Sequence, residues 1–443
     1  MKRAVLLILV CACGDNEPEI EIFEPTNGSR LAIEQYQFDD GTRLVQPTAF
    51  YDRRLHARCT PQEWIDGVIR CVPDAEQAFY RENTCETLFG VGNTIKHATH
   101  FIASNTRDGA RYPALAFAAR GRTDAIEQAF QLDGDACVRA TIPLFENTTF
   151  WELGNFVAGP DLVPITEREI GDGRVGLTVR ESDDGALVPV GFRDRELGVA
   201  CEPVTRGGHG ACEPIDAPVS DAFADLACMQ PAILVGDDAK LPAVASLSGS
   251  DGCRVYHAVE DTELPRAYRD VGGGCESLPT TDRVAVVGAR VELAEVTRTI
   301  EDAPKRRMQR IAATASDLHV YATRMFDTAT RAECELRQVG KKLRCLPTAL
   351  APIVRLFQPG CTVERRLAEV PQIACEASSF AVHDTGDTLE LHAIGLAFDG
   401  AAYTIAPGGA CVPYTATPGT SLYHVGPPLP DETFISAVPF GAR

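Results

Sequence analysis

Short runs of alternating apolar and polar residues extend along most of the chain, as in the segments 97–104 and 253–257. Clusters of Gly, Pro, Asp and Asn separate these runs about every 8 to 12 residues. Alternation with a period of two is typical of half-buried β-strands. Because the chain also contains 37 Gly and 29 Pro residues, long helices have little room. The pattern therefore predicts an all-β protein.

A strand pair recurs three times along the chain. In the first two copies an Asp-Gly turn joins two alternating runs, at Asp40-Gly41 and at Asp184-Gly185. Such a turn is a strong signal for a β-hairpin. The third copy has the segment Ser316–His319 at the corresponding place, without a glycine. A hairpin is expected there as well, although its turn lacks that signal.

A frame of three cysteines follows each strand pair. An aspartate precedes each frame by seven residues, and a proline follows each middle cysteine by two. The three frames are Cys59, Cys71 and Cys85, then Cys201, Cys212 and Cys228, then Cys334, Cys345 and Cys361, and their aspartates are Asp52, Asp194 and Asp327. Repetition of this kind is typical of a chain built from copies of one structural unit.

Each copy has a fourth cysteine in a glycine-rich turn further along the chain. These cysteines are Cys137, Cys253 and Cys411, and each precedes an aromatic residue and a glycine. The chain beyond residue 27 therefore divides into three copies, residues 28–172, 173–308 and 309–443. Each copy holds about eight strand candidates, enough for two small four-stranded sheets.

Two architectures fit six small sheets. The favoured one is a single six-bladed β-propeller made of three double blades, and the alternative is a row of three tandem β-sandwich domains. Copy one continues with an extended run, Leu162–Glu169, whereas copy three stops soon after Phe434. We expect the segment Glu19–Phe23 to supply the missing strand, because a propeller closes by completing its last blade from the other end of the chain.

The cysteine spacing predicts six disulfides. The first two cysteines of each frame flank a short turn, and cross-strand neighbours are close enough to be bridged. The third cysteine then pairs with the one in the glycine-rich turn. The expected pairs are Cys59–Cys71, Cys85–Cys137, Cys201–Cys212, Cys228–Cys253, Cys334–Cys345 and Cys361–Cys411. Cys275 and Cys375 break the threefold pattern, and the sequence leaves open whether they pair with each other or stay free.

The first residues of the chain have the features of an export signal. Two basic residues precede an apolar run, Ala4–Val10, that is too short to span a bilayer. The segment Val10–Gly14 resembles a bacterial lipobox. The resemblance implies a signal peptide over residues 1–12, acylation of Cys13 and an acidic tether over residues 13–27. Gly14 stands where an inner-membrane retention signal has aspartate, which favours the outer membrane. An ordinary signal peptide cleaved nearby is the alternative.

Composition excludes some classes of partner. The formal net charge is −20, from 42 basic and 62 acidic residues. Such a surface repels phosphate backbones, so we expect no nucleic-acid partner. After the signal no apolar run approaches the roughly 18 residues that a membrane-spanning helix needs. Without Cys11 and Cys13, the 16 cysteines leave an even number, which in an exported chain indicates disulfides.

The sequence carries little evidence of catalysis. Catalytic serine elbows, phosphate loops, zinc-protease motifs and dinucleotide fingerprints are all absent. No Cys-x-x-Cys pair occurs and the histidines are scattered, so we expect no metal or cofactor. Asp52, Asp194 and Asp327 recur in every copy, which favours a role in the fold, with ligand binding as the alternative. Trp64 lies in a predicted turn and is a candidate contact residue for a sugar or a protein.

The lipobox-like start, the repeated Asp, Cys and Pro frame and the segment Tyr423–Gly426 resemble cysteine-rich repeat lipoproteins of Gram-negative bacteria that have no assigned activity. The resemblance covers nearly the whole chain and implies no substrate. We therefore expect a lipid-anchored binding or structural platform for a protein or glycan partner. The alternative is an envelope hydrolase or lyase with an acidic site at the mouth of the propeller channel. That alternative needs two carboxylates, or a histidine and a carboxylate, in one concave pocket.

Overall fold

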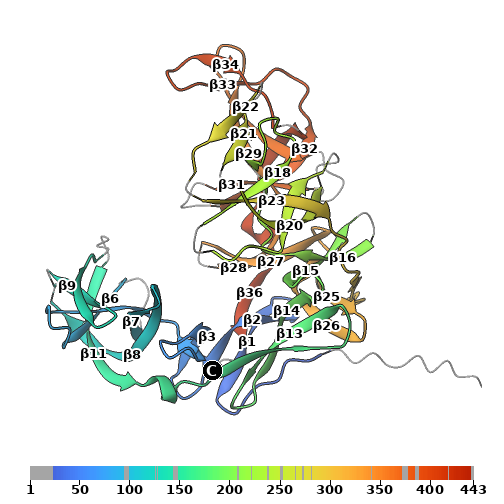
Figure 1. The fold of residues 1–443 in the computed structure, drawn as a ribbon. Helices are drawn as coiled ribbons and strands as arrows, with labels where there is room; N and C mark the ends of the chain where they lie inside the picture. The colour runs from blue at the N-terminus through green and yellow to red at the C-terminus, as the bar shows by residue number, and fades with distance from the viewer. Residues whose placement is uncertain are drawn as a thin grey trace, which may run out of the picture.

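The computed structural model of the chain describes residues 23–93, 99–124, 126, 128–142, 148–206, 209–220, 222–236, 239–249, 253–264, 266–271, 274–280, 282–340, 342–371, 378–384, 389–417 and 419–440. Within these residues the chain is all-β, as the sequence predicts. Apart from strands, the described residues form only two one-turn 3₁₀ helices, η1 (Gly159–Asp161) and η2 (Asp431–Thr433) (Figure 1).

Three antiparallel meanders of four strands form the centre of the molecule, which we call the hub. Meander 1 contains β1 (Leu31–Phe38), β2 (Arg43–Asp52), β3 (Ala57–Glu63) and β4 (Ile69–Pro73). Meander 2 contains β13 (Val175–Ser182), β14 (Leu187–Asp194), β15 (Val199–Arg206) and β16 (His209–Pro214). Meander 3 contains β25 (Met308–Ala315), β26 (Leu318–Asp327), β27 (Ala332–Val339) and β28 (Lys342–Pro347).

The first two strands of every meander form the predicted hairpin. In meander 3 the turn is shorter than in the other two, because Ala315 pairs directly with Leu318. Ser316 takes a positive φ of 55° there and so replaces the glycine of the Asp-Gly turns.

Each meander takes a fifth strand from the end of the preceding copy. These strands are β12 (Ile165–Ile170) on β13, β24 (Thr297–Ile300) on β25 and β36 (Ser436–Phe440) on β1. Just before each of these fifth strands, the chain also pairs with the last strand of the meander of the same copy. The amides of Cys71, Cys212 and Cys345 donate to the carbonyls of Val163, Ala294 and Ile435 at 2.9, 2.9 and 3.0 Å. The three meanders are thereby joined into a closed ring.

The strand that closes this ring is not the expected one. β36 lies between β28 and β1, so the segment after Phe434 supplies the strand that we expected from Glu19–Phe23. Of that expected strand the structure describes only Phe23, which makes a single parallel bridge to Val320. The reason is local: Ile435 occupies the place of Val163 in copy one, and in both copies a strand follows directly.

The apolar core of the hub lies between neighbouring meanders. Phe192 and the Cys201–Cys212 disulfide of meander 2 pack with Ala313 and Val320 from the hairpin of meander 3. Equivalent clusters join meander 1 to the hairpin of meander 2, and meander 3 to the hairpin of meander 1. Every meander therefore buries its apolar face against the next one in the ring, and none has a complete core alone.

The hairpin tips also satisfy backbone donors on their neighbours. Asp184 of meander 2 accepts hydrogen bonds from the amides of Arg30 and Leu31 at 2.5 and 2.7 Å. Asp40 of meander 1 accepts one from the amide of Met308 at 2.7 Å. Burial alone would raise the pKa of Asp184, but hydrogen bonds from the Ser182 hydroxyl and from these two amides favour its charged form and lower that pKa.

Each meander leads into a small barrel of five strands with an additional hairpin. Barrel 1 contains β5 (Glu76–Tyr80), β6 (Leu88–Asn93), β7 (His100–Arg107), β8 (Ala110–Thr123) and β11 (Thr148–Val157), with the hairpin β9 (Ala129–Asp133) and β10 (Ala136–Ala140). Barrel 2 contains β17 (Ala222–Phe223), β18 (Pro231–Val235), β19 (Val244–Ser248), β20 (Arg254–Leu264) and β23 (Arg283–Arg290), with the hairpin β21 (Ala267–Asp270) and β22 (Cys275–Leu278). Barrel 3 contains β29 (Leu350–Phe357), β30 (Glu364–Pro371), β31 (Phe380–Asp384), β32 (Leu389–Ala397) and β35 (Thr420–Pro428), with the hairpin β33 (Tyr403–Ile405) and β34 (Cys411–Pro413).

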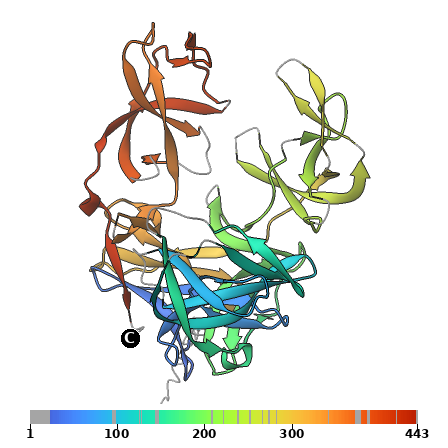
Figure 2. The ribbon, with the colours of Figure 1, turned by 90° about the vertical axis from the view of Figure 1, so that its left-hand side faces the viewer.

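The barrels correct the expected architecture. In barrels 1 and 3 the first strand pairs in parallel with the third, as β5 does with β7, and this contact closes the sheet on itself. In barrel 2 the same contact is a parallel bridge between Val219 and Ser246. Parallel pairing requires a crossover, which alternating residues do not encode. The molecule is thus a ring of three meanders carrying three barrels, and neither a six-bladed propeller nor three tandem sandwiches describes it. Barrels 2 and 3 extend from the hub as separate bodies (Figure 2).

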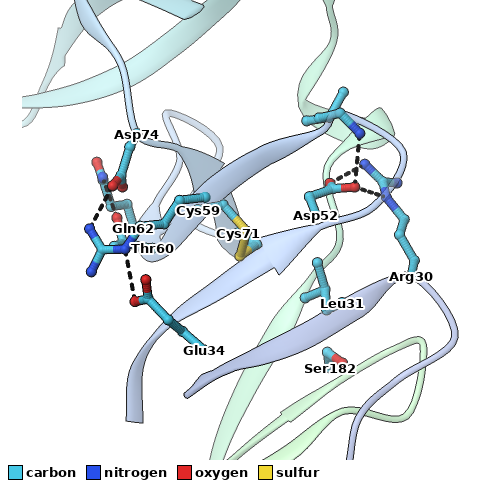
Figure 3. Close-up of a disulfide and its surroundings, with 12 residues drawn as sticks. Arg30, Leu31, Glu34, Asp52, Cys59, Thr60, Gln62, Cys71, Asp74 and Ser182 are labelled. Atoms are coloured by element: carbon cyan, nitrogen blue, oxygen red, sulfur yellow. Dashed lines mark hydrogen bonds and ion pairs between the residues drawn. A yellow bond between two sulfur atoms is a disulfide. The ribbon is translucent and has the colours of Figure 1, made fainter. Parts of the chain in front are cut away.

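One ion pair recurs in every copy of the hub. Asp52, Asp194 and Asp327 are all 0% exposed. Arg30 donates two hydrogen bonds to the Asp52 carboxylate, from Nε at 2.9 Å and from Nη2 at 2.6 Å (Figure 3). Equivalent bidentate contacts join Arg174 to Asp194 and Arg307 to Asp327, with shortest distances of 2.8 and 2.6 Å. Two-pronged contacts between guanidinium and carboxylate are among the stronger hydrogen bonds in proteins.

Each of these arginines holds a second part of the chain. Arg30, Arg174 and Arg307 donate to the carbonyls of Asp161, Glu292 and Thr433, at 2.8, 2.7 and 2.6 Å. Those carbonyls lie where the chain leaves each barrel to form β12, β24 and β36. Each aspartate also accepts amide hydrogen bonds from its own turn, such as that of Arg54 at 2.9 Å. The pair therefore fixes both the turn of a meander and the point at which the chain re-enters the ring.

Replacing one buried carboxylate should destabilise the hub strongly. Asp194→Asn removes the buried charge that Arg174 contacts with two donors and leaves it, among the described residues, only the exposed Glu196, at 3.0 Å, as a charged partner. Losing a hydrogen bond between charged groups costs about 1.5 to 3 kcal/mol. We expect that loss in the free energy of unfolding, measured by denaturant titration. Asp183→Asn makes the same chemical change on an exposed turn residue and should alter it by no more than about 0.5 kcal/mol. Equal stability of the two variants would show that the pair is dispensable.

Candidate functional site

The structure places the residues singled out in the sequence inside the molecule. Both oxygens of Asp52 are occupied by Arg30 and by turn amides, and Asp194 and Asp327 are held in the same way. Trp64 is 3% exposed and packs with Val72 where meander 1 meets barrel 1. These four residues support the fold, and none of them offers a surface to a ligand.

Five of the six predicted disulfides are present. These are Cys59–Cys71, Cys85–Cys137, Cys201–Cys212, Cys334–Cys345 and Cys361–Cys411. The sixth prediction is wrong, because Cys228 pairs with Cys275. Cys253 is also disulfide-bonded. Cys13 and Cys375 lie outside the residues that the structure describes.

The exchange of partners at Cys228 follows from the barrel topology. In every barrel the third cysteine of the frame sits in a loop after the first strand with a positive φ, 54°, 53° and 54° at Cys85, Cys228 and Cys361. The loop is stapled to the additional hairpin, through β10, β22 and β34. Cys253 instead precedes β20, a strand of the barrel wall. Tyr268 is the aromatic residue that follows Cys253 in the sequence, as Trp151 follows Cys137. It lies in the hairpin strand β21, however, whereas Trp151 lies in the wall strand β11, so the two are not equivalent.

Positions at which one copy differs from the other two are the better candidates for function. The residue directly after the middle cysteine is Val72 in copy one and Leu346 in copy three, and both are fully buried where their barrels pack on the hub. Copy two has Glu213 there, which accepts a hydrogen bond from the Tyr256 hydroxyl of barrel 2. Among the described residues, the apolar clusters of barrel 2 contain no residue of meander 2. Barrel 2 therefore meets the hub through a polar contact.

A cavity of about 370 Å³ opens beside this polar contact, and we call it the inter-copy pocket. Its walls come from meander 2, strand β24, meander 3 and the start of barrel 3. It is lined by Val204, Thr205, Glu213, Arg298, Arg324, Phe326, Arg331, Ala332, Glu333, Pro347, Thr348, Ala349, Ser379 and Phe380. Three arginines, Arg298, Arg324 and Arg331, lie in this cavity, although the net charge of the chain is −20.

Ion pairs hold two of these arginines across the boundary between copies two and three. Arg298 of β24 contacts Glu333 at 2.8 Å, and its side chain is only 8% exposed. Arg324 of β26 contacts Glu202 of β15, also at 2.8 Å. Relative to the repeated aspartates, copy one has Ala49 where copy three has Arg324, so this pairing is not part of the threefold pattern.

Two carboxylates face each other at the edge of the pocket. Glu202 and Glu213 are direct cross-strand partners on β15 and β16, and directly opposed like charges are destabilising. Burial raises the pKa of Glu202, and the attraction of Arg324 and Arg298 only partly opposes this. The folded state therefore holds the proton of the Glu202 carboxyl more tightly than the unfolded state does. The stabilisation that protonated Glu202 gives to the fold is present at low pH and is lost as the pH rises through its folded pKa.

A second departure from threefold symmetry lies on barrel 2, in the loop that the Cys228–Cys275 disulfide staples. Asp225 folds this loop by accepting amide hydrogen bonds from Ala227, Met229 and Gln230. Leu226 and Met229 then point outward and are 72% and 79% exposed. The corresponding positions beside Cys85 and Cys361 hold Asn83, Glu86, Pro359 and Thr362.

The centre of the hub does not match the expected acidic site. A cavity of about 240 Å³ lies there, between residues 23–25 and the inner strands of the three meanders. Its lining includes Arg43, Arg310 and Tyr321 but only one carboxylate, Glu24. The guanidinium of Arg310 lies 3.7 Å above the Tyr321 ring and pairs with Glu301 outside the cavity. The inter-copy pocket, by contrast, has two carboxylates in its lining, Glu213 and Glu333.

Two kinds of feature are absent from the described part of the chain. No group of three or more His, Cys, Asp or Glu residues there is arranged to hold a metal ion. No helix among those residues is long and apolar enough to cross a membrane.

The chain belongs to DUF7481, a family of unknown function, whose model matches residues 6–434. No curated protein and no solved structure shows significant similarity to it. The family therefore assigns no activity, and the unrepeated features of this chain carry the functional argument.

Peptide mapping without reduction tests the corrected disulfide. After trypsin, Cys228 lies in the peptide 207–240, Cys275 in 270–283 and Cys253 in 241–254. We expect a species that joins 207–240 to 270–283 and also carries 196–206 through Cys201–Cys212. Reduction should release all three peptides. A species that instead joins 207–240 to 241–254 would restore the pairing expected from the sequence.

Proposed function

We propose that this member of DUF7481 is a lipid-anchored protein of the bacterial cell envelope that offers a disulfide-stabilised platform to a protein partner. The disulfides are typical of an extracellular or periplasmic protein. The anchor is an acylated Cys13 in the lipobox-like segment Val10–Gly14, and Gly14 favours the outer membrane. Several acyl chains on one residue hold a protein stably, since each buried methylene contributes about 0.8 kcal/mol.

The stapled loop of barrel 2 is the observation that carries this proposal. Each barrel keeps a loop closed by a cysteine with positive φ. Among the described residues, the loop of barrel 2 exposes two large apolar side chains beside that cysteine, Leu226 and Met229, whereas the loop of barrel 3 exposes the single Val363, at 48%. Val271, in the hairpin next to Cys275, is also 52% exposed. Exposed apolar groups that a rigid loop presents together are typical of protein contact sites.

The surroundings favour a protein over other partners. The net charge of −20 opposes binding to anionic lipid heads and nucleic acid. Glycan recognition by the tryptophan considered from the sequence is not supported, because Trp64 is buried. Leu226 and Met229 instead match the apolar anchors of protein interfaces, and Met is among the residues enriched there.

A hydrolase remains the second candidate, on one specific observation. Glu202 and Glu213 are opposed across two strands, and such pairs have Cβ atoms roughly 4.5 to 5.5 Å apart. A raised pKa, as at Glu202, suits a general acid. However, Arg324 and Tyr256 already engage these carboxylates. The geometry therefore supports binding better than turnover.

Removal of the acylated thiol tests the anchor. The full chain, expressed in a Gram-negative host with an alkyne-bearing fatty acid, should incorporate the label and fractionate with the outer membrane. Cys13→Ser should lose the label and become soluble in the periplasm, whereas Cys11→Ser should keep it. Labelling of both variants to the same extent would refute acylation at Cys13.

Site-specific crosslinking tests the docking loop. With p-benzoylphenylalanine in place of Met229, ultraviolet light should trap one discrete envelope protein, identified by mass spectrometry. The threefold repeat supplies matched controls, since Glu86 and Thr362 occupy the same place beside Cys85 and Cys361. We expect no adduct at either control, and loss of the Met229 adduct with Leu226→Glu. Identical adducts at all three positions would contradict a specific role for barrel 2.

A further inference from the structure

The inter-copy pocket contains an arginine without a partner. Arg331 lines the cavity, and no ion pair or hydrogen bond engages its guanidinium among the described residues. It occupies the left-handed turn position of its meander with φ 54°, where the other copies have His56 and Gly198. An arginine is not needed for that turn, so the fold alone does not explain the residue.

The neighbouring groups keep this charge available to a ligand. Glu333 is engaged by Arg298 at 2.8 Å, and Glu202 by Arg324 at 2.8 Å. Glu213 accepts the hydroxyl of Tyr256. The buried Nε of Arg298 has no acceptor among the described residues, which adds a second donor with unmet capacity beside the cavity. Every carboxylate named here thus has a partner already, while donors remain unsatisfied.

The remaining walls suit a small polar molecule. Phe326 and Phe380 line the pocket with partly exposed rings, and Thr205, Thr348 and Ser379 add hydroxyl groups. The volume of about 370 Å³ is within the usual range for small-ligand sites, roughly 300 to 1,000 Å³. A guanidinium recognises carboxylate by planar, two-pronged hydrogen bonding, which a neutral ligand cannot reproduce.

We propose that the inter-copy pocket binds a small carboxylate-bearing ligand, with Arg331 as the residue that recognises the carboxylate. The ligand is either an acidic sugar or the free carboxyl end of a short peptide, because both combine a carboxylate with groups that the hydroxyls and rings can contact. This site is separate from the stapled loop of barrel 2. It does not depend on the identity of the protein partner.

Calorimetric titration of the intact protein with paired probes tests the site. Glucuronate and glucose differ in the carboxylate, as do N-acetylalanine and N-acetylalaninamide. We expect one acid of these two pairs to bind at one site and its neutral analogue to fail at the same concentration. Binding of glucuronate identifies a sugar ligand, and binding of N-acetylalanine identifies a peptide end. Failure of both acids to bind at concentrations up to about 10 mM would overturn the proposal.

Variants assign the binding to the arginine. Arg331→Gln should weaken the bound acid at least about tenfold, and Arg331→Lys should recover part of that loss because it keeps the charge but not the fork. Arg269→Gln removes an equivalent exposed charge from barrel 2 and should leave the affinity unchanged. Unaltered binding by a folded Arg331→Gln variant would reject the assignment, and so would equal loss in Arg269→Gln. Crosslinking through Met229 should be the same in both Arg331 variants as in the unchanged protein, so that a failure here leaves the platform proposal standing.

Discussion

The buried pair of an arginine and an aspartate is the contact on which the architecture depends. In each copy one carboxylate shapes the turn of a meander, and the arginine bound to it holds the carbonyl at which the chain leaves a barrel. The chain then crosses to the next meander, and after the third crossing β36 reaches β1 and closes the ring. Because each meander completes its core only against its neighbour, the copies cannot fold as independent domains. The disulfides between the first two cysteines of each frame reinforce the same sheets from within.

Repeated and unrepeated residues have different tasks in this molecule. The residues present in all copies, such as Asp52, Asp194 and Asp327, are buried and satisfied, and they build the ring. The unrepeated residues gather at the boundary between copies two and three and on barrel 2. There Glu213 replaces a buried aliphatic residue, Leu226 and Met229 are exposed, and Arg331 has no partner among the described residues. These unrepeated residues are not required by the fold of the ring, so they are the better candidates for a function.

Local features of the fold could be predicted from the sequence, and long-range ones could not. Alternating residues predicted strands, and five of six disulfide pairs followed from spacing. The barrels were missed because strand order depends on a parallel crossover contact, such as Glu76 with Phe101, that leaves no periodic signal. The partner of Cys228 was wrongly predicted because Tyr268 follows Cys253 at about the spacing at which Trp151 follows Cys137, which made Cys253 look equivalent to Cys137. Tyr268 and Trp151 lie in strands that are not equivalent, β21 and β11. The pocket residues were missed because single charges carry no motif. When the copies are aligned on their cysteines, Val72 and Leu346 stand opposite Glu213, and this difference alone marks the position of the pocket in the sequence.

Native-state hydrogen exchange at the amides of Cys71, Cys212 and Cys345 tests the closed ring most directly, since each donates to the segment that joins two meanders. The account predicts that all three exchange with the same free energy, within about 1 kcal/mol, because the ring opens as one cooperative unit. Arg174→Met removes only the second of the three buried arginine–aspartate pairs. If the ring opens as one unit, this substitution lowers protection at all three amides together. Loss of protection confined to Cys212 would contradict the account, because it would show three meanders that open independently.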